Sequence, residues 1–134
     1  MSDYTKLNLI QDVENVAPKF GLPAEMEARF PSGQLGLEHS GVGYEKFAPG
    51  FRVPFGHMHT QQEELYVIVQ GGGRLKLDDE IVDVAQWDAI RVPAGVFRNF
   101  EAGPDGLEVL AFGAPAVEGD KQAEAEMQPG WWSD

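Results

Sequence analysis

The sequence has no cysteine among its 134 residues. Disulfide bonds and thiolate metal sites are therefore excluded, which leaves histidine and carboxylate side chains as the strong metal ligands. No apolar run approaches the roughly 18 residues that a membrane-spanning helix needs. The first ten residues, MSDYTKLNLI, also lack the apolar stretch of a signal peptide. These absences predict a cytoplasmic protein.

Basic residues are few, with 10 Lys and Arg against 22 Asp and Glu, for a formal net charge of −12. Nucleic-acid backbones and anionic membrane surfaces are bound by clustered Lys and Arg, so the sequence predicts that neither is a partner. Hydrophobic residues make up 43% and charged residues 24%, which is typical of a soluble globular chain. This length suits one domain with an ordinary core.

Short apolar segments of strand length recur from residue 35 onwards. Turn-forming residues separate them, at Pro49-Gly50, at Asp78-Asp79, at residues 93–95 and at residues 103–106. The segments themselves cover residues 37–42, 44–47, 65–69, 74–77, 81–84, 88–92, 97–100 and 107–112. About eight short strands with a turn every 8–12 residues are typical of an antiparallel sandwich or barrel.

The two ends of the chain lack this pattern. Residues 1–34 are broken by prolines, and we expect a short edge strand at residues 7–10 and a helical turn at 12–17 that ends before Pro18. Residues 116–127 are acidic and rich in alanine, which favours a short helix or a loose tail. Trp131 and Trp132 follow, and two adjacent tryptophans seldom remain in water. We expect them to cover the barrel or a second subunit.

Two histidines lie two residues apart, at His57 and His59, and Glu64 follows after four more residues. In an extended chain, residues two apart point to the same side. Residues 60–63 are long enough to turn the chain, so the next strand brings Glu64 back beside both imidazoles. Two neutral nitrogens and one carboxylate suit a divalent transition metal. Without a metal, the same three side chains would form a hydrogen-bonded polar cluster.

This segment resembles the first signature of the cupin superfamily, G-x5-H-x-H-x(3,4)-E-x6-G. Counting back over six residues from Gly71 gives Glu64, rather than Glu63, as the ligand position. Gly50 stands one residue too far from His57 for a full match. The first signature is otherwise intact.

A second cupin signature, G-x5-P-x-G-x2-H-x3-N, is matched only in part, over residues 87–99. Pro93 and Gly95 stand where the signature requires them. Trp87 replaces the glycine, Arg98 replaces the histidine, and Asn99 follows it directly instead of three residues later. The histidine of this signature is the fourth metal ligand of the family, so the substitution by Arg98 bears directly on metal binding.

The resemblance implies an all-β fold, a single-domain jelly-roll β-barrel over residues 35–115. An N-terminal arm, residues 1–34, would pack on the barrel, and a short tail, residues 116–134, would follow it. The resemblance also implies a homodimer and a divalent metal (Fe, Mn, Ni or Zn) held by His57, His59 and Glu64, with a small-molecule ligand or substrate inside the barrel. The family includes oxygenases, isomerases and decarboxylases, and no catalytic residue is assigned.

Strand parity predicts which further side chains surround this pocket. Tyr66 and Ile68 share the parity of Glu64, and Phe55 shares that of the histidines. Arg98 joins them by its place in the second signature, although a guanidinium only donates hydrogen bonds and cannot ligate a metal. It either pairs with Glu64 in a metal-free pocket, clamps a ligand carboxylate beside the metal, or points outward. An enzyme, a ligand-binding protein and a structural barrel all remain open.

Overall fold

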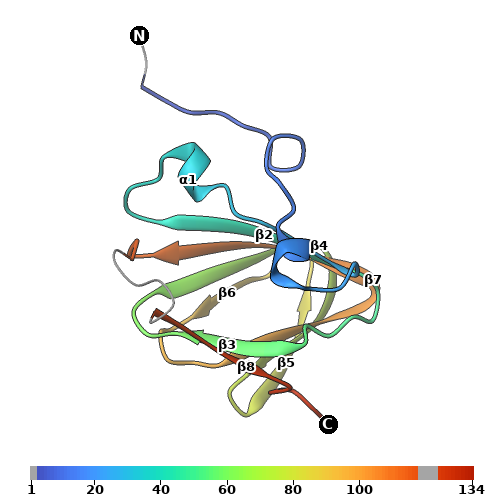
Figure 1. The fold of residues 1–134 in the computed structure, drawn as a ribbon. Helices are drawn as coiled ribbons and strands as arrows, with labels where there is room; N and C mark the ends of the chain where they lie inside the picture. The colour runs from blue at the N-terminus through green and yellow to red at the C-terminus, as the bar shows by residue number, and fades with distance from the viewer. Residues whose placement is uncertain (1–2, 118–123) are drawn as a thin grey trace.

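The computed structural model describes residues 3–117 and 124–134, and it is built mainly of β-strands (Figure 1). The elements in chain order are η1 (Ala17–Phe20), β1 (Met26–Arg29), α1 (Ser32–Leu35), β2 (Gly41–Phe47), β3 (Phe55–His59), β4 (Glu63–Leu77), β5 (Glu80–Ala85), β6 (Ala89–Val92), β7 (Arg98–Ala114) and β8 (Ala125–Pro129). In these residues, no helix has the length and apolar character needed to cross a bilayer. The predicted all-β jelly-roll fold is confirmed.

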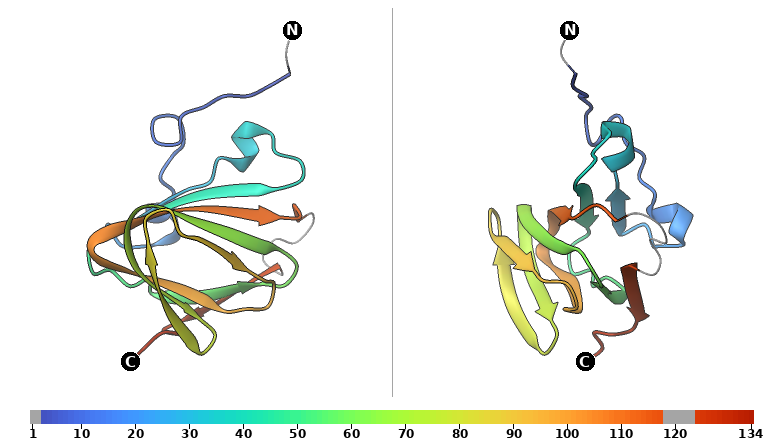
Figure 2. Two further views of the ribbon diagram at one scale, coloured as in Figure 1. Left: turned by 180° about the vertical axis from the view of Figure 1, so that it is seen from behind. Right: turned by 90° about the vertical axis from the view of Figure 1, so that its left-hand side faces the viewer.

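The two longest strands, β4 and β7, pair with each other and pass through both layers of the fold. Both strands bend along their length. On one side of the bend they belong to a layer with the strand order β1-β2-β7-β4-β6, and on the other side to a layer with the order β5-β4-β7-β3-β8. Figure 2 shows the strands curling around a shared interior. The bend therefore turns one antiparallel sheet into two facing layers.

Glycines make this bend possible. Gly71 has φ of 76°, and a Cβ on it would stand 2.0 Å from the carbonyl oxygen of Gly106. A Cβ on Gly73 would stand 2.1 Å from the carbonyl oxygen of Glu101. No side chain fits so close a backbone crossing. The predicted turn at residues 103–106 is wrong in one respect, because these residues bulge within β7 and the strand continues past them.

Inward-facing side chains change from polar to apolar along β2 and along β4. In β2 the inward Glu45 is followed by the buried Phe47, and in β4 Glu64 and Tyr66 are followed by Ile68. The core at the apolar end includes close aromatic pairs, with ring centroids 6.1 Å apart for Phe47 and Phe100. Burying each large apolar side chain contributes roughly 1.5 to 3 kcal/mol. One end of the barrel is thus packed, and the polar groups gather at the other.

The N-terminal region differs from expectation in two places. Residues 7–10 form no strand, and the helical turn begins at Ala17 instead of ending there. Proline is tolerated in the first turn of a helix because its missing N–H has no partner there, so Pro18 lies within the first turn of η1 instead of preceding it. The later segment Met26–Arg29 forms β1 and pairs with β2, which places part of the arm in the sheet.

The C-terminal region also differs from expectation. The predicted helix or tail falls partly on residues 118–123, which lie outside the described residues, but Ala125–Pro129 forms strand β8 along β3. An open sheet edge offers unpaired backbone groups, and these outweigh the helical preference of an alanine-rich segment. Trp132 is 4% exposed, and Trp131 stacks on Phe97 at 5.6 Å. The tryptophans therefore cover the barrel.

Candidate metal centre

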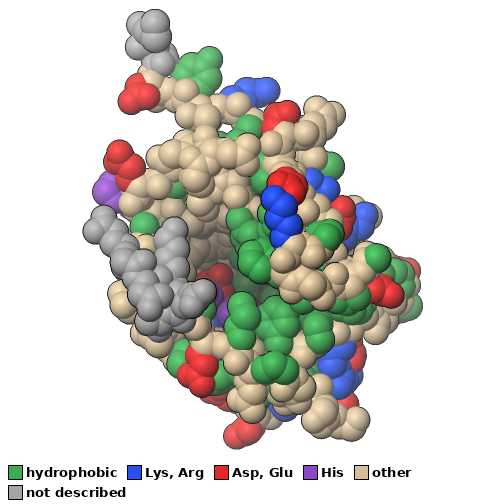
Figure 3. Space-filling view, viewed as in Figure 1, with side chains coloured by type: hydrophobic (Ala, Val, Ile, Leu, Met, Phe, Trp, Pro, Cys, Tyr) green, Lys and Arg blue, Asp and Glu red, His purple; other side chains and the backbone are tan. Residues whose placement is uncertain are grey.

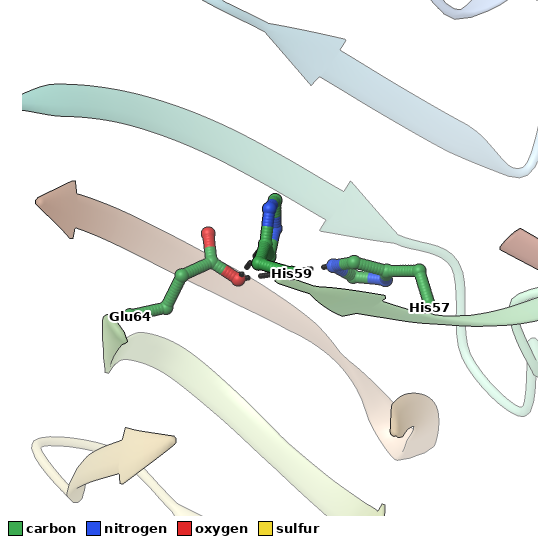
Figure 4. Close-up of side chains that lie close together, drawn as sticks. All are labelled: His57, His59 and Glu64. Carbon is green, nitrogen blue, oxygen red and sulfur yellow. Dashed lines mark ion pairs between the residues drawn. The ribbon is translucent and has the colours of Figure 1, made fainter. Parts of the chain in front are cut away.

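Three side chains converge on the inner wall of the barrel (Figure 4). His57 and His59 come from β3, and Glu64 comes from the start of β4 after a short turn. Nε2 of His59 is 3.3 Å and Nε2 of His57 is 3.7 Å from Oε1 of Glu64. Their ligand atoms all lie within 4.8 Å of one another. The structure thus brings together the three residues that the sequence singles out.

This arrangement fits a divalent transition metal. Ligand atoms bonded to one ion at about 2.1 Å stand roughly 3.0 to 3.4 Å apart for octahedral to tetrahedral bond angles. The distances from Oε1 of Glu64 to the two imidazole nitrogens, 3.3 and 3.7 Å, require movements of only a few tenths of an ångström, as in ordinary side-chain adjustment. Two imidazoles and one carboxylate on one face also leave positions open for a ligand.

The charges around Glu64 set the protonation of the triad. Burial opposes ionisation of Glu64, but hydrogen bonding with His57 and His59 outweighs it, and the pKa of this carboxyl lies well below its usual value. The hydroxyl of Tyr66 donates to Oε1 of Glu64 at 2.8 Å. Burial, reinforced by the charge of Arg98, lowers the pKa of His57. At neutral pH, the site therefore offers an ionised carboxylate and a neutral His57.

His59 has a second carboxylate partner that the sequence did not reveal. Its Nδ1 lies 2.6 Å from Oε2 of Glu124, which is 5% exposed. Burial opposes protonation of His59, but Glu64 and Glu124 outweigh it and raise the pKa of the imidazole. Glu124 lies 65 residues further along the chain, in no recognisable motif. Only the pairing of β8 with β3 brings it to the site.

Arg98 lies behind the triad and is completely buried, so the outward alternative is wrong. It is the register partner of His57 across β3 and β7, and its Nη2 lies 3.7 Å from Oε1 of Glu64. Its three guanidinium nitrogens have no hydrogen-bond acceptor among the described residues. Arg98 borders a void of about 20 Å³, together with Phe55 and Asn99, and does not line the main cavity.

The main cavity has a volume of about 500 Å³ and opens beside the triad. Figure 3 shows the surface hollowed at this place, with hydrophobic side chains along the rim. Tyr66 lines the cavity, whereas Ile68 is fully buried in the core. The apolar lining includes Phe30, Leu37, Val42 and Met127, and the acidic lining is Glu45, Glu64 and Glu124. Within the described residues, no Lys or Arg lines this cavity.

Glu45 is a second cavity residue that sequence reasoning missed. It faces inward from β2, and no hydrogen-bond partner for its carboxylate is seen in the described part of the chain. Burial, together with repulsion from Glu64, raises its pKa to about 7. The sequence did offer a signal for it, because Glu45 shares the inward side of its strand with Gly43 and Phe47, which are buried. A charged residue at an inward strand position seldom serves packing alone.

Comparisons with known proteins agree with this architecture. The family profile described as "Cupin domain" matches residues 43–112. A solved cupin protein from Bacteroides fragilis is 27% identical, with a TM-score of 0.69, over 89% of this chain and 92% of its own. No curated protein sequence matches the chain.

Two further solved structures show similarity in fold. Streptomyces PAC13, solved with uridine, is 16% identical with a TM-score of 0.68, and 92% of each chain is covered. Oxalate decarboxylase from Bacillus subtilis is 21% identical with a TM-score of 0.71, over 91% of this chain and 32% of its own. The present chain therefore spans about a third of the decarboxylase.

Proposed function

The chain belongs to the cupin family, and we propose that it is a metal-binding member that holds a small molecule in its cavity. The observation that carries this proposal is the convergence of two imidazoles and one carboxylate on the wall of a cavity of about 500 Å³. That volume is in the usual range for small-molecule sites. His57, His59 and Glu64 would hold Fe, Mn, Ni or Zn, since all accept this set of donors.

The remaining residues prepare the site for an ion and a ligand. When bound, the metal would polarise an oxygen atom of the ligand. Tyr66 holds the carboxylate of Glu64 by its hydrogen bond, and the apolar side chains of the cavity limit the access of water. The resemblance also favours a homodimer in the cytoplasm. Analytical ultracentrifugation of the purified chain measures the number of subunits.

The chemistry of the cavity favours a neutral or cationic polar ligand. Its lining residues include carboxylates and neither Lys nor Arg within the described residues. A dianion such as oxalate, the substrate that the name of the decarboxylase neighbour gives, would meet these acids without a guanidinium clamp. Uridine, bound by the PAC13 neighbour, is neutral and rich in hydroxyl groups. This support is chemical, because both neighbours share only the fold.

Metal content tests the proposal directly. The protein is purified without a histidine tag, reconstituted with Fe(II), Mn(II), Ni(II) and Zn(II) in turn, desalted and analysed by mass spectrometry. We expect about one equivalent of at least one metal, and its loss in His59→Ala. His39→Ala is the matched control, because His39 is exposed and is not among the residues that line the cavity. Less than about a tenth of an equivalent in the unmodified protein contradicts metal binding.

A metal-free binding protein is the second candidate, and the position of Arg98 favours it. Its guanidinium lies 3.7 Å from Glu64 and already supplies positive charge beside that carboxylate. A fixed cation there weakens metal binding by repulsion. This candidate predicts a negative result in the metal analysis together with ligand-induced stabilisation of the metal-free chain in a thermal-shift screen.

A further inference from the structure

Glu124 uses both of its carboxylate oxygens on one short segment of the chain. Oε2 contacts Nδ1 of His59 at 2.6 Å, and Oε1 accepts the backbone N–H groups of Gln61 and Gln62 at 3.2 and 3.0 Å. The backbone carbonyl of Glu124 accepts the N–H of Thr60 at 2.7 Å. The turn between β3 and β4 is therefore fastened to the residue that precedes β8.

The two oxygens have separable consequences. The bonds to Oε1 hold the turn, which is a structural role. The contact of Oε2 keeps a proton on Nδ1 of His59, because a carboxylate can only accept a hydrogen bond. With its proton on Nδ1, His59 presents the lone pair of Nε2 to the side where Glu64 lies. His57, in contrast, has Glu64 as its one carboxylate neighbour in the described residues.

We propose that Glu124 is a positioning residue for the metal centre. It fixes the ring of His59 with Nδ1 protonated and Nε2 directed at the ion, so that the C-terminal segment completes a site whose ligands all lie in β3 and β4. The proposal rests on the proposed metal-binding function. An acid behind a metal-bound histidine orients the ring and raises its basicity, and losing such a partner typically weakens metal binding by about 10- to 100-fold.

The variant Glu124→Gln separates the two roles. The amide keeps one oxygen, which can still accept from Gln61 and Gln62, and it replaces the other oxygen with an NH2 group that cannot accept from Nδ1 of His59. Glu126→Gln is the matched control, because it removes the same charge from an exposed position in β8. Both variants are made in the full chain.

Zn(II) affinity is measured by competition with a chelator of known affinity, and the amide shifts of Gln61 and Gln62 report on the turn. We expect Glu124→Gln to bind Zn(II) about 10- to 100-fold more weakly with the turn intact, and Glu126→Gln to match the unmodified protein. Binding by Glu124→Gln within about twofold of the unmodified protein, or equal losses in both variants, overturns the positioning role.

A second measurement needs no variant. In the Zn(II)-loaded unmodified protein, nitrogen-15 NMR of the imidazoles shows which nitrogen of His59 carries the proton. A proton on Nδ1 supports the proposal, and a proton on Nε2 overturns it even if Glu124→Gln fails to fold. Failure of the proposed function looks different, because the unmodified protein then binds no metal at all. That outcome removes both ideas, whereas tight binding by Glu124→Gln removes only this one.

Discussion

Two glutamates at different depths of the barrel are surrounded by basic side chains in different ways. On the surface, Glu101 accepts from Arg52 at 2.8 Å and from Arg74 at 2.7 and 3.0 Å. Arg52 also stacks over Trp132, 4.3 Å from the ring centroid. Inside, Glu64 faces His57, His59 and Arg98 at 3.3 to 3.7 Å. The surface cluster of Glu101, Arg52 and Arg74 is therefore joined by close hydrogen bonds. The basic groups of the interior cluster stand further from their glutamate, Glu64.

This difference in spacing separates a structural cluster from a binding site. Hydrogen-bonded pairs at 2.7 to 3.0 Å leave no room for an ion, and the surface cluster fastens the C-terminal segment to the barrel. The interior cluster keeps a buried guanidinium, that of Arg98, without a hydrogen bond in the described residues. Unsatisfied buried charge is costly, and proteins keep it mainly at functional sites.

The largest expected effect comes from neutralising each glutamate in turn. Glu64→Gln removes the only charged ligand of the triad, and we expect metal affinity to fall by at least about 100-fold. Glu101→Gln should leave metal content unchanged and lower the free energy of unfolding by about 1 to 3 kcal/mol, through lost hydrogen bonds to charged groups. Chelator competition and urea unfolding measure the two quantities. Equal metal affinity in both variants would erase the functional distinction.

Replacing one arginine in each cluster should change metal affinity in the interior cluster and the free energy of unfolding in the surface cluster. Arg98→Met removes a positive charge beside the metal position, and we expect metal affinity to rise by at least about tenfold. Arg52 lies in the surface cluster. Arg52→Met should leave metal affinity within about twofold of the unmodified protein and lower the free energy of unfolding by about 1 kcal/mol. Isothermal titration with Zn(II) checks the first expectation. Weaker binding in Arg98→Met would mean that Arg98 supports the site instead of opposing the ion.

The interior triad could be predicted from the sequence because its geometry is local. Alternation along β3 places His57 and His59 together, and a short turn returns Glu64 to them. Glu124 could not be predicted, since its position depends on strand pairing 65 residues away. The direction of Arg98 was equally open, because a side chain at the start of a strand faces in or out according to the register that β7 adopts.

The fold shows the same division between local and non-local information. The strands between residues 41 and 115 carry their own alternation and turn residues, so their existence was predictable. The predicted segment at residues 37–42 is wrong over its first four residues, because β2 begins at Gly41. Residues 103–106 carry the composition of a turn, but glycine and proline serve a bulge as well as a chain reversal, and only the pairing with β4 decides. In β8, the open edge of β3 overrides an alanine- and glutamate-rich sequence that favours a helix.

Glu45 offers a smaller effect that depends on pH. Its pKa is raised to about 7 in the fold, so the folded state holds a proton that the unfolded chain releases near its ordinary value of 4.5. The protonated group is therefore fully compatible with folding below about pH 4.5, and its ionisation lowers stability as the pH rises through 7. In the metal-free protein, we expect Glu45→Gln to match the unmodified protein at pH 4 and to be about 1 to 2 kcal/mol more stable at pH 8.

The surface glutamate supplies the opposite trend as a control. Burial opposes ionisation of Glu101, but the hydrogen bonds from Arg74 and Arg52 outweigh it and lower its pKa. Its contribution is present above the unfolded pKa and is lost as the pH falls through the folded one. Glu101→Gln should therefore cost stability at pH 8 and little in strong acid. Urea unfolding across this range measures both variants, and parallel pH curves would contradict the contrast.

The smallest expected effect concerns the contact between Lys76 and Trp131, beside the surface cluster. The ammonium of Lys76 stands 4.7 Å from the ring centroid of Trp131, a half-buried cation–π contact worth about 0.5 kcal/mol. Lys76→Met should lower the unfolding free energy by no more than that, and metal affinity should not change. Trp131 packs against Gly56, the residue before His57, where a Cβ would stand 2.5 Å from its ring. A change of metal affinity in Lys76→Met, measured by chelator competition, would therefore show that the surface cluster acts on the triad through β3.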